Sequence, residues 1–219
     1  MFYYYGRKKR MAPSYPKPSC ATIIEPFSGA AAYSLHDDNW KREVILVERD
    51  DRVAAIWKWL IHEATDEDMA ELPELQIGDS TTEFLHILHS VSKGTFGNKR
   101  ITVTEIMSKN WNRSRKIMRE ALPKVKHWRI IEGDYTDAPD IEATWFIDPP
   151  YQGAPGTGYR FGSDLIDYEA LAVWTMKRRG QVIACEGEGA EYLPFVPLRT
   201  NNGVGGKLNT EMVWVKENQ

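Results

Sequence analysis

The 219-residue sequence has no apolar run close to the ~18 residues that a membrane-spanning helix needs. Its N-terminus places the basic residues Arg7 to Arg10 directly after aromatic ones, and no apolar stretch follows, so we expect no signal peptide. The two cysteines, Cys20 and Cys185, are too few and too far apart for a disulfide framework or a zinc site. Both lie in apolar runs, and we expect buried free thiols in a reducing cytoplasm.

Two phosphate-binding signatures are also missing. The turn from Glu25 to Ala31 lacks the second and third glycines of a G-x-G-x-x-G fingerprint, which argues against a NAD-dependent dehydrogenase. The sequence contains no Gly-Lys-Ser/Thr, which argues against a P-loop nucleotidase. Internal repeats and low-complexity linkers are absent as well. The length therefore fits one domain with a small insertion.

Acidic and basic residues are unevenly distributed along a chain whose net charge is only −3. Between Lys109 and Arg129 there are eight basic residues and one acidic residue, Glu120, whereas acidic residues concentrate between Glu63 and Glu74. A mildly acidic protein with separate basic patches can still bind a phosphate backbone. The basic segment is therefore either a nucleic-acid surface or an ordinary solvated helix face.

Short apolar runs alternate with helical patterns at both ends of the sequence. Residues 21–27 and 44–48 are predicted as buried strands, followed by an Ala-rich helix at 30–35 and an amphipathic helix opened by Asp50, respectively. After residue 122 we expect strands at 128–132, 143–148 and 181–186, a helix at 164–179 and a terminal β-pair ending at 211–215. This order predicts an α/β fold, a mostly parallel sheet with helices on its faces.

The segment 65–122 interrupts this alternation. It is acidic first, then helical around Phe84 to His89, and it ends in a basic helix around Asn110 to Leu122. We therefore expect a main domain formed by residues 1–64 and 123–219. The interruption at 65–122 is predicted to be a small helical insertion and a candidate target-recognition region.

Asp148-Pro149-Pro150-Tyr151 is the sharpest chemical signal in the sequence. It follows a predicted strand, and ligands of open α/β sheets gather at the carboxyl ends of strands. The two prolines stiffen the turn and remove two backbone donors. A carboxylate and a neighbouring carbonyl can then each accept one hydrogen of an amino group, while Tyr151 offers a flat face to a base.

This pattern suits alkylation of an aromatic amine such as N6 of adenine. The amine is a poor nucleophile because its lone pair is delocalised into the ring. Two acceptors on its hydrogens would localise that lone pair, and the carboxylate would offset the positive charge that grows on nitrogen. The alternative is a proline-stiffened turn whose Asp only accepts local hydrogen bonds.

Three further positions have the spacing of a cofactor site. Glu25-Pro26-Phe27-Ser28-Gly29 places a glycine at a strand end, where backbone can approach a ligand closely. Glu48-Arg49 ends the second strand about twenty residues later, where an acid can bind ribose hydroxyls. Asp134-Tyr135 follows the third strand, where Asp134 could accept from an adenine amino group. The simpler alternatives are a helix-dipole partner for Glu48 and a turn residue for Asp134.

In this order the motifs resemble those of the Dam-type DNA N6-adenine methyltransferases, over nearly the whole chain. The matching pieces are aromatic-Gly-x-Lys at the N-terminus, Glu-Pro-Phe-x-Gly, the acid after the second strand, Gly-Asp-Tyr, Asp-Pro-Pro-Tyr and a closing hairpin at 207–215. The resemblance implies a Rossmann-like methyltransferase fold, with a mostly parallel seven-stranded sheet and an antiparallel C-terminal hairpin. It also implies S-adenosylmethionine as cofactor and direct in-line methyl transfer to N6 of a flipped adenine in DNA.

The site residues that the resemblance implies form three groups. The catalytic group is Asp148, Pro149, Pro150 and Tyr151. The cofactor-binding group is Tyr4, Tyr5, Gly6, Lys8, Glu25, Pro26, Phe27, Ser28, Gly29, Glu48, Arg49, Asp134, Tyr135 and Asp148. The nucleic-acid-binding group takes Lys93, Phe96, Asn98, Tyr159 and Phe161 from the resemblance. To these we add Lys99, Arg100, Asn112, Arg113, Arg115 and Lys116, which are basic or polar residues next to the loop 93–98 and in the basic helix. No metal is expected.

Several alternatives stay open at this point. The same pocket chemistry would serve adenine in RNA, and a catalytically silent nucleic-acid-binding relative would keep the same fold. Guanine N2 and cytosine N4 fit less well, the latter because its enzymes more often have serine in place of Asp148. The insertion is short for the family, which leaves the recognised sequence and any partner restriction enzyme open and is compatible with a phage origin. We expect a cytoplasmic monomer, in a bacterial or phage-infected cell, with no membrane partner.

Overall fold

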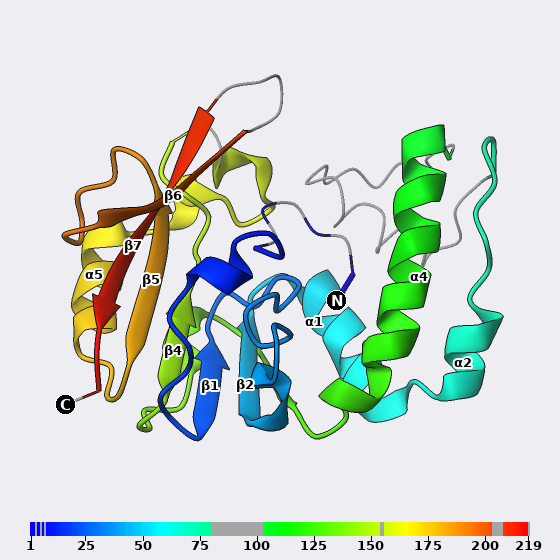
Figure 1. The fold of residues 1–219 in the computed structure, drawn as a ribbon, viewed down its shortest axis with the longest axis horizontal. Helices are drawn as coiled ribbons and strands as arrows, with labels where there is room; N and C mark the ends of the chain where they lie inside the picture. The colour runs from blue at the N-terminus through cyan, green and yellow to red at the C-terminus, as the bar shows by residue number, and fades with distance from the viewer. Residues whose placement is uncertain are drawn as a thin grey trace.

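The computed structural model describes residues 1, 2, 4, 6, 8–79, 103–153, 156–202 and 208–218, without the side chains of 201 and 202. Seven strands form one sheet: β1 (Thr22–Glu25), β2 (Glu43–Glu48), β3 (Arg129–Glu132), β4 (Thr144–Ile147), β5 (Val182–Gly187), β6 (Val196–Asn202) and β7 (Leu208–Lys216). Their order in space is β3-β2-β1-β4-β5-β7-β6 (Figure 1). Strands β1 to β5 pair in parallel, and β7 runs antiparallel to both β5 and β6. The predicted Rossmann-like sheet with an antiparallel C-terminal hairpin is confirmed.

The central strands are apolar without interruption because both faces of the sheet are buried. Successive side chains alternate between two hydrophobic clusters, so that Ile23, Val44 and Leu46 face one side while Ile24, Ile45 and Val47 face the other. The predictions at 44–48 and 181–186 coincide with β2 and β5 to within one residue at each end. Because β1 to β5 pair in parallel, their carboxyl ends all lie along one edge of the sheet.

Helices cover both faces of the sheet. Helix α1 (Asp51–Lys58) begins where the Asp50 side chain accepts a hydrogen bond from the backbone N–H of Arg52, and it buries Ile56 and Trp57 in the first cluster. Helix α5 (Tyr168–Met176) packs on the opposite face through Leu171 and Ala172 (Figure 1). Short helical turns occupy η1 (Ala12–Ser14), η2 (Asn39–Lys41), η3 (Trp59–Glu63), η4 (Tyr135–Asp137), η5 (Gly156–Gly158) and η6 (Ser163–Leu165).

The predicted insertion contributes α2 (Asp66–Glu71) and α4 (Glu105–Val125), the latter longer at both ends than the expected basic helix. Met69 of α2 and Met118 of α4 belong to the same hydrophobic cluster as the first face of the sheet. Helix α4 runs antiparallel to the parallel strands, so its N-terminal end lies at the level of their carboxyl ends (Figure 1). The helix expected at 84–89 lies outside the described residues, and the domain boundaries stay a prediction.

The Ala-rich helix predicted at 30–35 is wrong. Gly29 and Ala31 both have left-handed backbone conformations, with φ of +43° and +48°, and residues 29–38 form a series of turns. A right-handed helix cannot pass through such residues, so the helix propensity of alanine is overridden here. The helix predicted at 164–179 is also shorter, because η6 precedes it and the Asp167 side chain caps it by accepting from the backbone N–H of Ala170.

Both cysteines are buried and free, as expected. Among the described helices none combines the length and apolar character needed to cross a membrane.

Candidate active site

A cleft of about 280 Å³ lies at the carboxyl ends of the strands. It is lined by sixteen of the residues that the sequence nominated: Tyr4, Gly6, Lys8, Glu25, Pro26, Phe27, Ser28, Gly29, Glu48, Arg49, Asp134, Tyr135, Asp148, Pro150, Tyr159 and Phe161. Its volume is close to the lower end of the roughly 300–1,000 Å³ typical of small-ligand pockets. The segments after β1, β2, β3 and β4 thus meet in one site, as the parallel topology requires.

The other nominated residues differ in their relation to this cleft. Pro149 and Tyr151 flank the cleft without lining it. Tyr159 and Phe161, assigned above to nucleic acid, line the same cleft as the cofactor residues. The predictions on Tyr5, Lys93, Phe96, Asn98, Lys99 and Arg100 fall outside the described residues.

Glu48 organises the turn after β1. One carboxylate oxygen accepts from the Ser28 hydroxyl at 3.1 Å and the Gly29 backbone N–H at 3.0 Å, and the other accepts from the Asp50 backbone N–H at 3.0 Å. The side chain is 8% exposed, and burial raises its pKa to about 7 although the hydrogen bonds from Asp50 and Gly29 oppose the shift. Trp57 of α1 fixes the same turn by donating its indole N–H to the Gly29 carbonyl.

Two glycines allow close approaches around the cleft. A Cβ on Gly29 would lie 2.9 Å from the ring of Tyr4, and a Cβ on Gly6 would lie 2.1 Å from the hydroxyl oxygen of Tyr159. Gly29 has a φ of +43° and Gly6 a φ of +73°. Residues that carry a side chain rarely adopt such positive values. Tyr4 and Tyr159 also contact each other, with ring centroids 5.9 Å apart.

Aromatic rings and ion pairs form the end of the cleft near β2 and β3. Phe27 stacks on Tyr135 with ring centroids 5.4 Å apart. Arg49 pairs with Asp134 at 3.4 Å, and its guanidinium lies 4.9 Å from the ring centre of Phe161. Such flat apolar surfaces with nearby carboxylates suit a heteroaromatic ring that carries amino hydrogens.

Arg160 ties the segment after the Asp-Pro-Pro-Tyr turn to the start of α1. Its guanidinium lies 3.3 Å from one carboxylate oxygen of Asp50 and also pairs with Asp51. Residues 159–161, which all line the cleft, are thereby tied to the start of α1.

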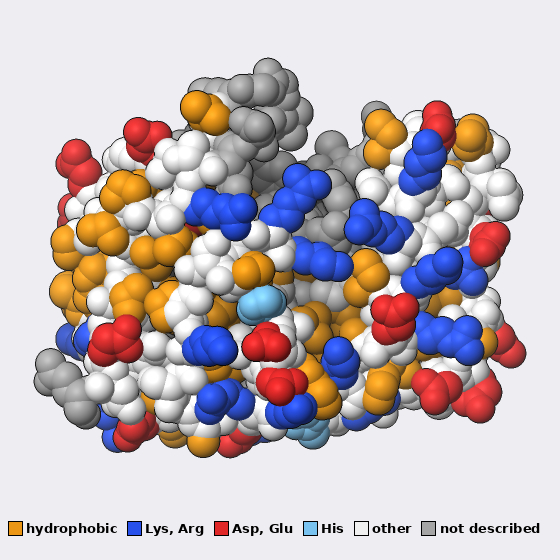
Figure 2. Space-filling view, in the orientation of Figure 1, with side chains coloured by type: hydrophobic (Ala, Val, Ile, Leu, Met, Phe, Trp, Pro, Cys, Tyr) orange, Lys and Arg blue, Asp and Glu red, His pale blue; other side chains and the backbone are white. Residues whose placement is uncertain are grey.

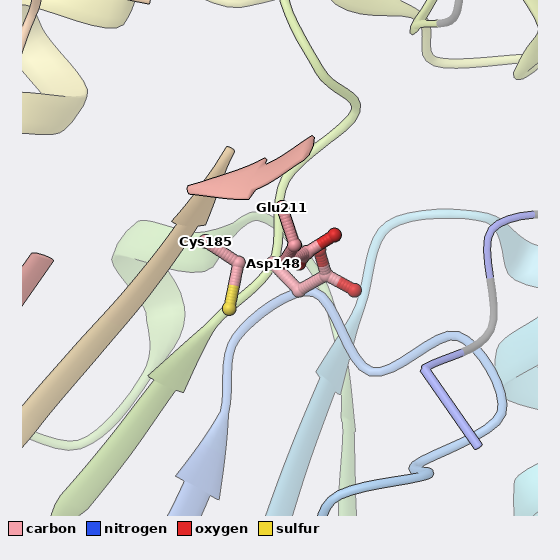
Figure 3. Close-up of side chains that lie close together, drawn as sticks. All are labelled: Asp148, Cys185 and Glu211. Atoms are coloured by element: carbon pink, nitrogen blue, oxygen red, sulfur yellow. The ribbon is translucent and has the colours of Figure 1, made fainter. Parts of the chain in front are cut away.

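Asp148 stands at the end of β4 with its side chain 17% exposed, directed into the cleft. The Lys8 ammonium lies 2.9 Å from its Oδ1 and 3.6 Å from Oε1 of Glu211, which comes from β7. Figure 3 shows Asp148 and Glu211 side by side, with the thiol of Cys185 from β5 next to them. Lys8 also sits 4.2 Å from the ring centre of Tyr151.

Burial raises the pKa of Asp148 to about 6; Lys8 acts in the opposite direction and the Glu211 charge adds to the rise. Burial alone would lower the pKa of Lys8, but the charges of Asp148 and Glu211 outweigh it and raise the pKa. Lys8 is therefore a permanent ammonium at neutral pH. Asp148 is mostly ionised at neutral pH and titrates not far below it.

Asp148, Cys185 and Glu211 offer three potential metal ligands whose atoms lie within 4.8 Å of one another. The Lys8 ammonium already supplies the cation between the two carboxylates. Burial also raises the pKa of the Cys185 thiol, and a protonated thiol is a poor ligand. The cluster is better described as a lysine-centred charge network than as a metal site.

Neighbouring elements hold the Asp-Pro-Pro-Tyr turn in place. The Pro150 carbonyl accepts a hydrogen bond from the Tyr168 hydroxyl of α5, and the Gln152 backbone N–H donates to Glu186 of β5 at 3.1 Å. The Tyr151 hydroxyl donates to Glu211 at 2.5 Å. The turn is therefore held by hydrogen bonds to three elements, α5, β5 and β7.

The nominated residues of α4 divide into two faces. Asn112 accepts from the backbone N–H of Leu75, and Arg115 pairs with Glu74 at 3.2 Å, so both turn toward the segment 73–79. Arg113 and Lys116 are exposed. Figure 2 shows lysine and arginine side chains gathered across the middle of this face of the molecule, several of them over α4.

Among the residues that the sequence analysis missed at the site are Tyr15, Asp50, Arg160 and Glu211, together with cleft-lining residues such as Phe146 and Asp167. Glu211 left a usable signal, because it shares the inward face of β7 with Val213 and an acid on an apolar strand face is unusual. Tyr15 left none, since it follows a short turn and reaches Glu211 across 196 positions of the chain.

No family model and no curated protein sequence matches this chain. Among solved structures, a candidate methyltransferase from Pseudomonas syringae aligns over 96% of this chain and 97% of its own, at 12% identity and a TM-score of 0.43. A candidate methylase from Haemophilus influenzae aligns over 99% and 92%, at 9% identity and a TM-score of 0.41. The glycopeptide N-methyltransferase MtfA, solved with S-adenosylmethionine, aligns over 99% and 68%, at 12% identity and a TM-score of 0.40. Likenesses this distant do not indicate a function.

Proposed function

We propose that this protein transfers a methyl group from S-adenosylmethionine to the N6 amine of adenine in DNA. The observation that carries the proposal is the position of Asp148. Its carboxylate reaches the cleft from the end of β4, beside two prolines and against the Lys8 ammonium. An acceptor held this firmly, next to a rigid carbonyl, matches the two hydrogens of a single amine.

The carbonyl adjacent to Asp148 is the second acceptor in this proposal. We assign the role to the carbonyl of Pro149, which directly follows Asp148, whereas the Pro150 carbonyl accepts from Tyr168 of α5. Asp148 and Pro149 together would draw both amine hydrogens away from the plane of the base and localise the nitrogen lone pair. The Asp148 carboxylate would also stabilise the positive charge that develops on nitrogen.

The cleft fits the proposed cofactor in charge and shape. Six acidic side chains line it, Glu25, Glu48, Asp50, Asp134, Asp148 and Asp167, against three basic ones, Lys8, Arg49 and Arg160, which favours a cationic ligand. S-adenosylmethionine, when bound, supplies an electrophilic methyl group on a cationic sulfur. Phe27, Tyr135 and Phe161 provide the apolar surface for its adenine ring.

Glu48 is suited to hold a ribose hydroxyl. It accepts three hydrogen bonds within the protein, and a carboxylate offers about four lone-pair positions, so one acceptor position is left for a ligand. The three internal bonds fix the carboxylate before any ligand arrives, which lowers the entropy cost of binding.

The acceptor adenine must leave the duplex to reach Asp148, because the carboxylate lies inside a cleft. Extrusion costs a few kcal/mol, which contacts to phosphates must offset. The exposed Arg113 and Lys116 of α4 are the described residues that we assign to these contacts.

The test is incorporation of labelled methyl groups. The protein is incubated with tritiated S-adenosylmethionine and with duplex DNA, single-stranded DNA or RNA, and the nucleosides are separated after digestion. We expect label in N6-methyladenine from DNA. Label in another base, or in RNA alone, would contradict the proposal.

Asp148→Asn provides the matched variant, because the amide keeps the size of the side chain but loses its charge. It should reduce incorporation by about 10²- to 10³-fold, the range seen when a preorganised electrostatic group is removed. The dissociation constant for S-adenosylhomocysteine should stay within about threefold by calorimetry, a difference worth under 1 kcal/mol. Asp38→Asn, at a carboxylate 71% exposed and paired with Lys41, is the control and should change neither value.

A further inference from the structure

Three donors from three segments of the chain converge on one oxygen of Glu211. The Tyr15 hydroxyl donates to Oε1 at 2.5 Å, the Tyr151 hydroxyl donates to the same atom at 2.5 Å, and the Lys8 ammonium lies 3.6 Å from it. Glu211 is 9% exposed, and Tyr15 is 6% exposed. Burial raises the pKa of both tyrosines, so their hydroxyls remain donors throughout the physiological range.

The convergence explains how the ring of Tyr151 is placed. Its hydroxyl is tied to Glu211, the Lys8 ammonium lies over the ring, and a Cβ on Gly187 of β5 would lie 3.2 Å from its edge. Glycine at 187 leaves just enough room for the ring. Tyr151 thus has little freedom to rotate, and its ring packs against the Lys8 ammonium.

The charges explain why the network needs both carboxylates. Lys8 is shared by Asp148 and Glu211, at 2.9 Å and 3.6 Å, and all three groups are removed from bulk water. With Asp148 as its only partner, a flexible lysine side chain could swing with it toward the cleft opening. Glu211 gives the ammonium a second negative partner on β7, and Lys8 in turn orients Asp148.

We propose that Glu211 is a positioning residue for the amine site: together with Tyr15 it anchors Tyr151 and Lys8, and through Lys8 it sets the orientation and charge of Asp148. Its effect on rate rests on the function proposed above, whereas its effect on Asp148 does not. Glu211 itself does not contact the acceptor.

The experiment measures Asp148 directly. The aspartate carboxyl carbons are labelled with ¹³C, the Asp148 signal is assigned with Asp148→Asn, and its titration is followed in the wild type and in Glu211→Gln. The amide keeps the volume and an oxygen acceptor for the two tyrosines but removes the negative charge. Because the Glu211 charge disfavours ionisation of Asp148, the titration midpoint should fall, by on the order of one pH unit.

The rate experiment uses the same variants. In Glu211→Gln the acid limb of the kcat profile should shift downward in pH with the NMR midpoint. In Glu211→Leu, where the three donors lose their acceptor, kcat should fall at least about tenfold at every pH while KM for the cofactor stays within about twofold, as expected for an interaction that matters only at the acceptor. Glu211→Asp should recover part of the loss. Glu188→Gln, an exposed acid that closely follows β5, is the control and should leave midpoint and rate unchanged.

Two outcomes would overturn the positioning role: an Asp148 midpoint that is unchanged or raised in Glu211→Gln, or a wild-type kcat in folded Glu211→Leu. Folding is checked by the ¹H–¹⁵N spectrum of each variant. A protein that methylates no adenine but shows the shifted midpoint would refute the proposed function and keep the positioning role, so the two failures are distinguishable.

Discussion

A single ammonium, that of Lys8, pairs with two carboxylates, Asp148 and Glu211, at the centre of the candidate site. Burial and the nearby Glu211 charge both raise the pKa of Asp148, and only the Lys8 ammonium opposes them strongly. Lys8 therefore decides whether Asp148 can act as an anionic acceptor near neutral pH.

Replacing Lys8 with Met should shift the pH dependence of methyl transfer upward. Lys8 lowers the pKa of Asp148, so its loss raises that pKa above its present value of about 6 and leaves less of the active, ionised form at pH 7. We expect the acid limb of the kcat profile to move up by about one pH unit or more. Lys9→Met, at an exposed neighbour, is the control. If the acid limb of the kcat profile did not shift in Lys8→Met, Lys8 would not control the pKa of Asp148.

Gly6 and Gly189 offer a matched pair for testing the close approach to Tyr159. Both have positive φ, +73° and +96°, but a Cβ would meet the Tyr159 hydroxyl only at Gly6 and nothing within 4 Å at Gly189. Each Ala variant should lose roughly 1–2 kcal/mol of unfolding free energy from backbone strain. Only Gly6→Ala should also weaken S-adenosylhomocysteine binding, by about tenfold or more, since Tyr159 lines the cleft. Calorimetry and urea denaturation separate the two effects, and equal affinities in the two variants would remove Tyr159 from the cofactor site.

At the scale of elements, α4 presents its basic residues on two different faces. Asn112 and Arg115 hold the segment 73–79, whereas Arg113 and Lys116 point to solvent. Of these four residues, only Arg113 and Lys116 are exposed and available for a phosphate backbone.

The double variant Arg113→Ala with Lys116→Ala should weaken DNA binding and flatten its salt dependence. Removing one side chain that neutralises a phosphate reduces the slope of log K against log salt concentration by about 0.9, so the pair should account for a change near 2. Lys109→Ala is the control, because Lys109 already pairs with Glu105 on the same helix at 2.6 Å. Binding is followed by fluorescence anisotropy at several salt concentrations, and an unchanged slope would exclude α4 as the recognition surface.

The sequence predicts well the helices and strands that carry a local pattern of apolar residues. Strands such as β2 and β5 appear as unbroken apolar runs because both their faces are buried, and their order places Glu48, Asp134 and Asp148 at one edge of the sheet. The turn after β1 was mispredicted since nothing in its alanines reveals the left-handed Ala31.

Contacts between distant segments could not be predicted. Tyr15 and Glu211 meet across 196 positions, and no local spacing encodes that meeting. The facing of α4 is a related case: Asn112 and Arg115 have the composition of nucleic-acid contacts, but the packing of 73–79 against the helix decides where they point.

At the scale of the whole molecule, acids buried beside the cleft couple stability to pH. Glu25 is 2% exposed and accepts a hydrogen bond from the Ser34 backbone N–H, yet burial raises its pKa from 4.5 to about 7. The folded protein therefore binds this proton more tightly than the unfolded chain. The contribution of Glu25 to stability is most favourable below pH 4.5, falls as the pH rises toward about 7, and is least favourable above that value.

Glu25→Gln should remove this loss of stability at high pH. The amide oxygen can still accept from Ser34, and the amide carries no charge. In urea denaturation without cofactor we expect the variant to be more stable than the wild type at pH 8, by on the order of 1–3 kcal/mol, and nearly equal to it at pH 5. Glu191→Gln, at an exposed position, should be neutral at both values. If Glu25→Gln were less stable than the wild type at pH 8, the ionised Glu25 carboxylate would be stabilising the folded state.

The bond between Tyr15 and Glu211 also has a consequence for biosynthesis. During translation, a chain released from the ribosome tunnel only as far as β5 contains Lys8, Tyr15, Asp148 and Tyr151 but not Glu211, the acceptor that holds three of them. The site around Asp148 therefore cannot be complete until β7 has been synthesised and has paired with β5. A product truncated after β5 would carry the sequence motifs but lack this acceptor.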